Sequence, residues 1–393
     1  LGISNVTYFS KVFNVINQML FAIKAEAVAE RAIEKIREGK KPIIAFSSTM
    51  GSFLQQTLDE EGIRPNDGTS IKTDFALILK NGLNGVMRYT ETSAKGVKSF
   101  GSYEPNELSM EGRIEYWRIM GHIEDAVSGI FISPIDIVLD KIRSAGYSAQ
   151  EVTGRSIRID YAKDYKSGEV KRIKKVNVND AFASFNNNET DVLLINQSGS
   201  TGASAHAVVT PTVPLNEVKP RVMIVLQFEL NIDTEVQKRG RIFRTGQVHQ
   251  PEYLYLNSAI PAEQRLMMML AQKLKSLDAN TSSNQNQNEK MMRVPDFLNK
   301  YGDRIVTDYL LENSKIHDLL GRPPLEQSGG ETAARISGRM AVLSTDQQAS
   351  FYEAITNRYL EYIDYLKQTG EYDLEVEELN FQAKTIAKKI VVA

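Results

Sequence analysis

The stretch TDVLLIN, residues 190–196, is a short apolar run between polar residues, typical of a strand buried on both faces of a parallel sheet. Three further segments have the same character, and stretches with helical spacing separate them along the chain. They are PIIAFSS (42–48), RVMIVLQF (221–228) and EYLYLNS (252–258). Short apolar strands that alternate with helices predict an α/β fold with a mainly parallel sheet flanked by helices.

The segments around these strands predict helices, a fifth strand and a hairpin. DFALILK (74–80) is predicted as another strand, and the alternation over 155–175 about a Lys-Ser-Gly turn predicts a β-hairpin. This hairpin would be an insertion at about 150–180. Apolar spacing near 3.6 residues and terminal glycines predict helices over 11–39, 49–62 and 132–146.

A compositional change divides the chain into two predicted parts. The polar, low-complexity segment NTSSNQNQNE (280–289) is typical of a loop or linker. Beyond it, residues 344–370 have the apolar spacing of a long amphipathic helix. We therefore expect a sheet-containing part over 1–280 and a helical C-terminal region over 281–393.

Composition excludes several classes of site. The 393 residues include no cysteine and only four histidines, so disulfides, cysteine nucleophiles and thiolate metal sites are excluded, and we expect no metal site. A net charge of −2 means that any nucleic-acid surface is local. No apolar run approaches the roughly 18 residues of a membrane span, and no signal peptide is evident. We expect a cytoplasmic or nucleoid-associated location rather than secretion or a membrane. Without an initiator methionine, the chain is expected to belong to a longer one.

The basic segment QKRGRIFRTGQ, residues 237–247, is the strongest candidate for chemistry. A guanidinium is always charged and can bind two phosphate oxygens at once. On a helix, Arg241 and Arg244 would project from the same side, and Gly240 would let another backbone come close. This pattern favours arginines presented to a phosphate on a facing surface. The alternative is a surface helix whose arginines pair with nearby carboxylates. No phosphate-binding GxxxxGK[ST] loop occurs in the sequence.

The order of motifs resembles a known family. SST after one strand, SGSTGAS after a second and QxxxGRxxRTGQ one strand later resemble motifs IV, V and VI on the second RecA-like lobe of superfamily 2 helicases. The resemblance narrows to the strawberry notch family. It covers GRIFRTGQVHQPEYLYLNSAIPAEQRLMMMLAQKLKSLDANT (240–281), SPIDIVLDKIRSAGYSAQEVTGR (133–155), NKYG (299–302) and YDLEVEEL (372–379). After motif V, where the family often has acidic and basic residues, this chain has AHAVVTPTVPLNEVKP.

The resemblance implies a role for each motif. Arg241 and Arg244 would reach the γ-phosphate of ATP, and Gln237 would brace that motif near the nucleotide. Gly240 and Gly202 would also belong to the ATP site, and Gly202 with its neighbours would form a turn between the ATP cleft and the nucleic acid. ATP and Mg²⁺ would be bound mainly by a first RecA-like lobe, in the same polypeptide or a companion chain. Without that lobe this chain should not hydrolyse ATP. The residues expected to contact a phosphodiester backbone are Ser48, Thr49, Ser200 and Thr201.

Three functions remain open. The first is the second lobe of an ATP-dependent helicase or translocase that acts on DNA, with RNA as an alternative track. The second is a catalytically silent binding or structural lobe of a larger assembly, in which the arginine motif is a relic. A two-lobed sugar-nucleotide transferase would also use paired α/β lobes, but it explains neither the arginine motif nor the C-terminal region. The hairpin 155–175 has eight Lys or Arg against three acids, so it is either a nucleic-acid contact or a solvated surface.

Overall fold

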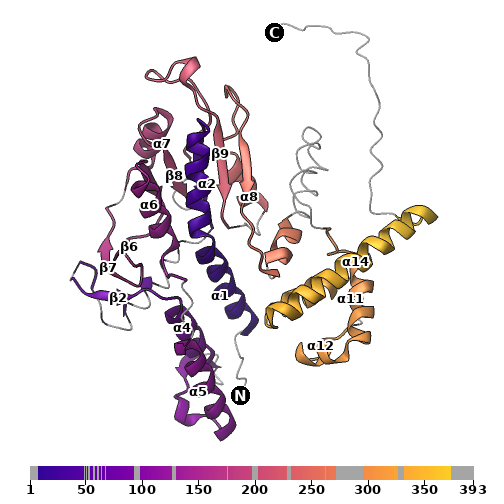
Figure 1. Cartoon of the computed structure of the whole chain (residues 1–393). Coiled ribbons are helices and arrows are strands. Elements are labelled where there is room, and N and C mark those ends of the chain that lie inside the picture. Colours follow the sequence, from indigo (N-terminus) through magenta and orange to yellow (C-terminus); the bar gives the residue numbers. More distant parts are fainter. Residues whose placement is uncertain are drawn as a thin grey trace.

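In the computed structural model, residues 8–372 are described with several gaps, and within them five strands form one sheet whose neighbours all run parallel (Figure 1). This confirms the predicted α/β fold, which is consistent with a RecA-like lobe, and it places all four predicted apolar strands in one sheet. The strand order is β10 (Glu252–Tyr255), β9 (Arg221–Val225), β1 (Lys41–Ala45), β8 (Val192–Ile195) and β5 (Ala149–Val152). The gaps are residues 48, 50, 52–53, 56–57, 60–61, 63, 67, 93–97, 126–129, 175, 197–201, 228–231, 262, 271–294 and 326–331.

The sheet has a hydrophobic core on each face, because successive side chains of a strand point to opposite sides. On one face, Ile44 of β1 lies in a core with residues of α2 (Ala25–Arg37) and α6 (Pro134–Ser144), which run side by side in Figure 1. On the other face, Ile43 lies in a core with residues of α7 (Val178–Asn186). The central parts of the sheet, residues 42–45, 192–195 and 222–225, are apolar because both faces are covered.

Residues 74–80, predicted as a strand, mostly belong to helix α4 (Ala76–Val86), so that prediction was wrong. The Asp74 carboxylate accepts a hydrogen bond from the Ala76 N–H at 2.8 Å, which satisfies a backbone donor at the helix start. A short apolar run does not by itself distinguish a strand from a buried helix. The remaining strand of the sheet is β5, whose polar Gln150 and Glu151 hid it from the prediction.

The single helix predicted over 11–39 is two helices, α1 (Tyr8–Ile23) and α2, which are separated at Lys24. Lys24 is buried and its ammonium donates to the carbonyls of Leu226, at 2.7 Å, and Leu256, at 3.0 Å. The break between α1 and α2 therefore places Lys24 in contacts with residues more than 200 positions away, which the local sequence does not predict. Within the predicted helix 49–62, the residues that the structure describes as helical are Gly51, Leu54, Gln55, Leu58 and Asp59.

The predicted hairpin is confirmed as β6 (Ile157–Tyr161) and β7 (Ser167–Arg172), which form an antiparallel sheet with β2 (Ser70–Lys72). The turn precedes the predicted Lys-Ser-Gly, since Ser167 already belongs to β7 and Tyr165 has a φ of 58°. Other elements are β3 (Arg88–Thr92), β4 (Lys98–Ser102), α5 (Met110–Asp125) and the 3₁₀ turns Pro105–Glu107 and Leu215–Glu217.

The C-terminal region is helical, as predicted, and its helices pack around a hydrophobic core that also includes Met268. Its longest helix, α14 (Thr345–Thr369), begins with a capping box between Ser344 and Gln347 and ends at Gly370, which has a φ of 74°. The proposed boundary near 280 lies outside the described residues. No described helix has the length and apolar character needed to cross a membrane. The other helices of the region are α11 (Lys300–Glu312), α12 (Ser314–Leu319) and α13 (Thr332–Met340).

Candidate functional site

Arg241 and Arg244 follow helix α8 (Ile232–Arg239) rather than lying on it, and only the start of the basic segment, residues 237–239, is helical. The prediction that Arg241 and Arg244 project from one helix was therefore wrong, because the chain turns at Gly240. A Cβ at Gly240 would lie 3.3 Å from the carbonyl oxygen of Val236, within the preceding helical turn. The Gly240 carbonyl in turn accepts a hydrogen bond from Arg244 Nε at 3.0 Å. Gly240 thus allows a tight turn at the end of its own helix. We had expected it to allow the close approach of a different backbone segment.

A buried polar network fixes α8 to the sheet. Glu235 is 0% exposed and accepts hydrogen bonds from the Tyr255 hydroxyl, at 2.7 Å, and from Lys238 Nζ, at 3.2 Å. Lys238 also approaches the carbonyl of Gln227 at 3.5 Å, and the Gln227 side chain accepts two hydrogen bonds from Ser47, at 3.1 Å each. The helix before the arginines is therefore tied to the carboxyl ends of β1, β9 and β10.

Arg241 is half-buried and only partly satisfied. Its Nη1 donates to the carbonyl of Ala203 at 3.1 Å, while its buried Nε has no hydrogen-bond partner among the residues that the structure describes. The main-chain oxygen of Arg241 accepts a hydrogen bond from the Ala205 N–H at 2.8 Å. Burial and the nearby Arg244 guanidinium lower the pKa of Arg241. The segment after β8 thus holds both the backbone and the side chain of this arginine.

Arg244 is exposed, and its backbone N–H donates to the Gln247 side chain at 3.1 Å. Within the described part of the chain, neither Arg241 nor Arg244 forms an ion pair with a carboxylate. His206 also lies near these arginines: burial, Arg221 and Arg244 lower its pKa, which favours the neutral imidazole, and its buried Nδ1 has no hydrogen-bond partner among the described residues. Two neighbouring guanidinium groups, one of which has an unsatisfied Nε, suit an anion such as a phosphate.

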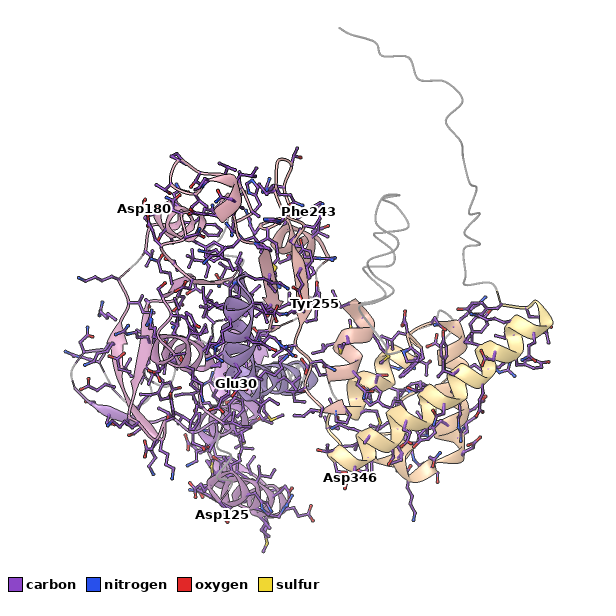
Figure 2. The ribbon with its side chains drawn as sticks, turned by 45° about the horizontal axis from the view of Figure 1, so that its top comes forward. Glu30, Asp125, Asp180, Phe243, Tyr255 and Asp346 are labelled. Atoms are coloured by element: carbon purple, nitrogen blue, oxygen red, sulfur yellow. The ribbon has the colours of Figure 1, made fainter. Side chains whose placement is uncertain are left out.

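Figure 2 shows where this motif lies on the molecule. Phe243, which is between the two arginines in sequence and 49% exposed, lies at the outer rim of the sheet-containing part. Tyr255 lies nearer the C-terminal helices. Phe243 and the exposed Arg244 next to it therefore lie where a second body could approach, whereas Arg241 is half-buried.

The edge expected to contact nucleic acid is only partly described. β1 and β8 are parallel neighbours, and the Phe46 N–H donates to the Ile195 carbonyl at 3.2 Å, so the segments after both strands leave from one edge. Thr49 lies on this edge, and its hydroxyl accepts a hydrogen bond from the Gly51 N–H at 3.3 Å. The other three predicted contacts, Ser48, Ser200 and Thr201, lie outside the described residues, so their proximity to Thr49 stays a prediction.

Two predicted nucleotide-site residues lie in different settings. Gly202 has a φ of 86°, a left-handed conformation that favours glycine, and it leads into the segment that holds Arg241. Gln237 is exposed on α8, and its predicted role beside the nucleotide stays a prediction. The basic cluster supplies no carboxylate for Mg²⁺, and no three His, Asp or Glu side chains of the described residues are grouped to hold a metal.

The basic hairpin carries less free charge than its composition suggested. Arg155 is buried in ion pairs with Asp136 and Glu151, both at 2.6 Å. Two more cations of the hairpin pair with acids of their own strands, Arg158 with Asp160 and Lys171 with Glu169. Sequence reasoning missed the Arg155 cluster, although SPID and QEVTGR carry all three members within 20 residues. These pairs favour a structural role for part of the hairpin.

Comparison with known proteins supports the sequence resemblance. A family model described as the C-terminal domain on Strawberry notch homologue matches residues 135–378. Protein strawberry notch homolog 2 of Mus musculus is 32% identical over 152 residues, 38% of this chain and 11% of that protein. Protein strawberry notch of Drosophila melanogaster is 30% identical over 146 residues, 37% of this chain and 9% of that protein. Protein strawberry notch homolog 1 of Homo sapiens is 22% identical over 238 residues, which are 53% of this chain and 17% of that protein. The chain spans less than a fifth of these relatives.

Proposed function

The chain belongs to the strawberry notch family of helicase-type C-terminal domains, and from this premise we propose that it works as the second lobe of an ATP-dependent DNA translocase or helicase. In this proposal, a first RecA-like lobe binds ATP and Mg²⁺, and the arginine motif of this chain closes on the nucleotide. RNA is the alternative track.

The observation that carries the proposal is the pair Arg241 and Arg244, which have no carboxylate partner among the described residues. Leaving a buried donor such as Arg241 Nε unsatisfied costs about 1–3 kcal/mol. That cost is recovered if an anion completes the site. A phosphate oxygen fits this requirement, because guanidinium groups bind phosphates through charge-assisted hydrogen bonds.

The two arginines would have different tasks. Arg244 is exposed, and among the described residues its Nε and its backbone N–H are hydrogen-bonded, so its two terminal guanidinium nitrogens could contact the γ-phosphate. Arg241 is held by Ala203 and would stabilise charge closer to the lobe. Both would act on charge that develops as the phosphoryl group leaves, which is where an arginine finger contributes about 10³–10⁵ in kcat. Bound ATP and Mg²⁺ supply the reacting phosphate and its countercharge.

Nucleic acid would follow the carboxyl edge of β1 and β8. Thr49 lies there, and Ser48, Ser200 and Thr201 adjoin the same strands in sequence. Hydroxyl and backbone N–H groups suit contacts to phosphate oxygens, which are independent of base sequence. In this proposal the lobe contacts the phosphodiester backbone of the nucleic acid and not its bases, as translocation along any sequence requires.

The test is steady-state ATP hydrolysis by the complete two-lobe protein with and without DNA. Arg244→Ala should lower DNA-stimulated kcat by about 10³-fold or more, with a smaller change in the KM for ATP. Arg244→Lys should not restore activity, because an ammonium lacks the planar two-pronged geometry. The matched control is Arg239→Ala, since Arg239 lies two residues before Arg241 but stacks on Tyr253 at 4.7 Å.

Wild-type turnover in both Arg241→Ala and Arg244→Ala would overturn the proposal. The catalytically silent binding or structural lobe would then be the better description of this chain. Loss of activity in Arg239→Ala equal to that in Arg244→Ala would show a general dependence on charge instead of a specific contact.

A further inference from the structure

Two buried cations lie side by side where β1 and β9 begin. Lys41 and Arg221 are opposite each other in the register of the two strands, and they are 3% and 1% exposed. Both lie over the ring of Phe185, at 4.5 Å and 5.1 Å. In the described part of the chain neither forms an ion pair. Burying a cation without a countercharge is costly, so each needs a compensating set of hydrogen bonds.

The two cations have different acceptors. Lys41 Nζ donates to the carbonyl of Thr190 at 2.6 Å, just before β8. Arg221 Nε donates to the carbonyl of Ala205 at 2.9 Å, and its Nη1 donates to the carbonyl of Lys219 at 2.8 Å. Arg221 therefore reaches the segment after Gly202, and Lys41 does not.

That segment is the one that holds the arginine motif. The Ala205 N–H donates to the main-chain oxygen of Arg241 at 2.8 Å, and Arg241 Nη1 donates to the Ala203 carbonyl at 3.1 Å. From the other side, Asn186 Nδ2 donates to the carbonyl of Ser204 at 3.0 Å. Residues 203–205 are thus clamped between Arg221 and Asn186 on one side and Arg241 on the other.

We propose that Arg221 is a positioning residue, which sets the place of Arg241 through the backbone of Ala205. The inference rests on the proposed function, because Arg241 matters for catalysis only if it meets a phosphate. Arg221 contacts no nucleotide itself. Its fork of fixed N–H groups reaches two carbonyls at once, which the single ammonium of a lysine reproduces poorly.

A positioning role predicts a specific kinetic signature. Misplacement of a catalytic group by about 1 Å can cost about 10²-fold in rate. Arg221→Met in the complete two-lobe protein should therefore lower DNA-stimulated kcat by about 10- to 100-fold. The KM for ATP should change less than about twofold, because the first lobe would supply most ground-state contacts. Arg221→Lys should recover only part of the loss.

Lys41→Met is the matched control. It removes a neighbouring cation that is equally buried and lies on the same ring, but it leaves residues 203–205 untouched. It should keep wild-type kcat. Asn186→Ala is a second, milder variant that loosens the same segment from the end of α7, and it keeps the inference testable if Arg221→Met does not fold.

Amide hydrogen exchange gives a readout that does not depend on catalysis. In the nucleotide-free two-lobe protein, Arg221→Met should speed exchange of the Ala205 N–H, which is bonded to Arg241, by about tenfold or more. Lys41→Met should leave that amide as in the wild type. Equal kinetic losses in Arg221→Met and Lys41→Met, or unchanged kcat in Arg221→Met and Asn186→Ala, would overturn the inference. If Arg241→Ala and Arg244→Ala both keep wild-type kcat, the proposed function fails, whereas the exchange result still tests the clamp.

Discussion

Lys24 and Glu263 form a buried ion pair across 239 residues of sequence, and Lys24 is 4% exposed. The same ammonium donates to the carbonyls of Leu226 and Leu256, which follow β9 and β10. The second oxygen of Glu263 accepts a hydrogen bond from the Ser258 N–H at 2.6 Å. One side chain thus joins the break between α1 and α2, two strand ends and the segment that leads toward the C-terminal region.

Removing the charge of Glu263 should be strongly destabilising. Glu263→Gln keeps the shape but takes away the negative charge beside a buried ammonium, which costs about 3–5 kcal/mol of unfolding free energy. Urea denaturation measures this loss. Glu312→Gln is the control, because the pair of Glu312 with Arg358 is exposed and should contribute less than about 1 kcal/mol. A loss in Glu263→Gln no larger than in Glu312→Gln would contradict the buried pair.

The buried Lys41 should make stability depend on pH. Burial, followed by the Arg221 and Lys219 charges, lowers the pKa of Lys41 to about 7, from 10.5. Between these values the unfolded chain binds a proton that the folded chain releases, so the contribution of Lys41 to stability rises with pH. The slope is at most about 1.4 kcal/mol per pH unit. Relative to Lys41→Met, the wild type should therefore gain stability from pH 7.5 to pH 9.5, measured by urea denaturation. A constant difference between the two proteins would show that Lys41 stays protonated when folded.

The central strands could be predicted because both of their faces are buried, so that VLLI within TDVLLIN and VMIVL within RVMIVLQF are apolar without interruption. Strand β5 could not be predicted, because it lies at the edge of the sheet and contains two half-buried polar residues. The break at Lys24 could not be predicted either. Its cause is a set of acceptors more than 200 residues away, whereas the local sequence continues to favour a helix.

The arginine motif could be predicted because two arginines and a glycine occur in a fixed order relative to the strands. Its geometry could not be predicted. The i, i+3 spacing suggested a helix, but α8 ends before Gly240. Arg221 was read only as the start of a strand, because its role depends on Ala205 and Asn186, which the fold brings to it. Long-range hydrogen bonds to backbone carbonyls leave no local pattern in the sequence.

The packing of the C-terminal helix α11 can be tested at Gly302, with Gly121 of α5 as the matched control. A Cβ at Gly302, near the start of α11, would lie 1.7 Å from the Phe297 carbonyl oxygen, so the backbone would have to move. Gly302→Ala should lower unfolding free energy by about 2 kcal/mol or more, through strain in a packed core. A Cβ at Gly121, within α5, would meet no described atom within 4 Å outside the adjoining helix backbone, so Gly121→Ala should stabilise by about 0.5–1 kcal/mol. Thermal and urea denaturation would show opposite signs, and two changes of the same sign would contradict this packing.

The last prediction distinguishes the two candidate surfaces for nucleic acid. Thr49→Asp places a negative charge at the carboxyl edge of β1, where it would repel a phosphate by about 1–4 kcal/mol at close range. The Kd for DNA, measured by fluorescence anisotropy on the complete two-lobe protein, should therefore rise by about tenfold or more. The effect should shrink as salt is added, because screening weakens the repulsion.

The comparison variant is Lys163→Ala with Lys166→Ala, two exposed cations at the turn of the basic hairpin. Three cations of that hairpin are already paired with carboxylates, so we expect this double variant to change the Kd less than about threefold. Each removed phosphate contact would also reduce the dependence of log K on log salt by about 0.7–0.9. A large loss in the lysine variant with none in Thr49→Asp would move the track from the carboxyl edge of β1 and β8 to the hairpin.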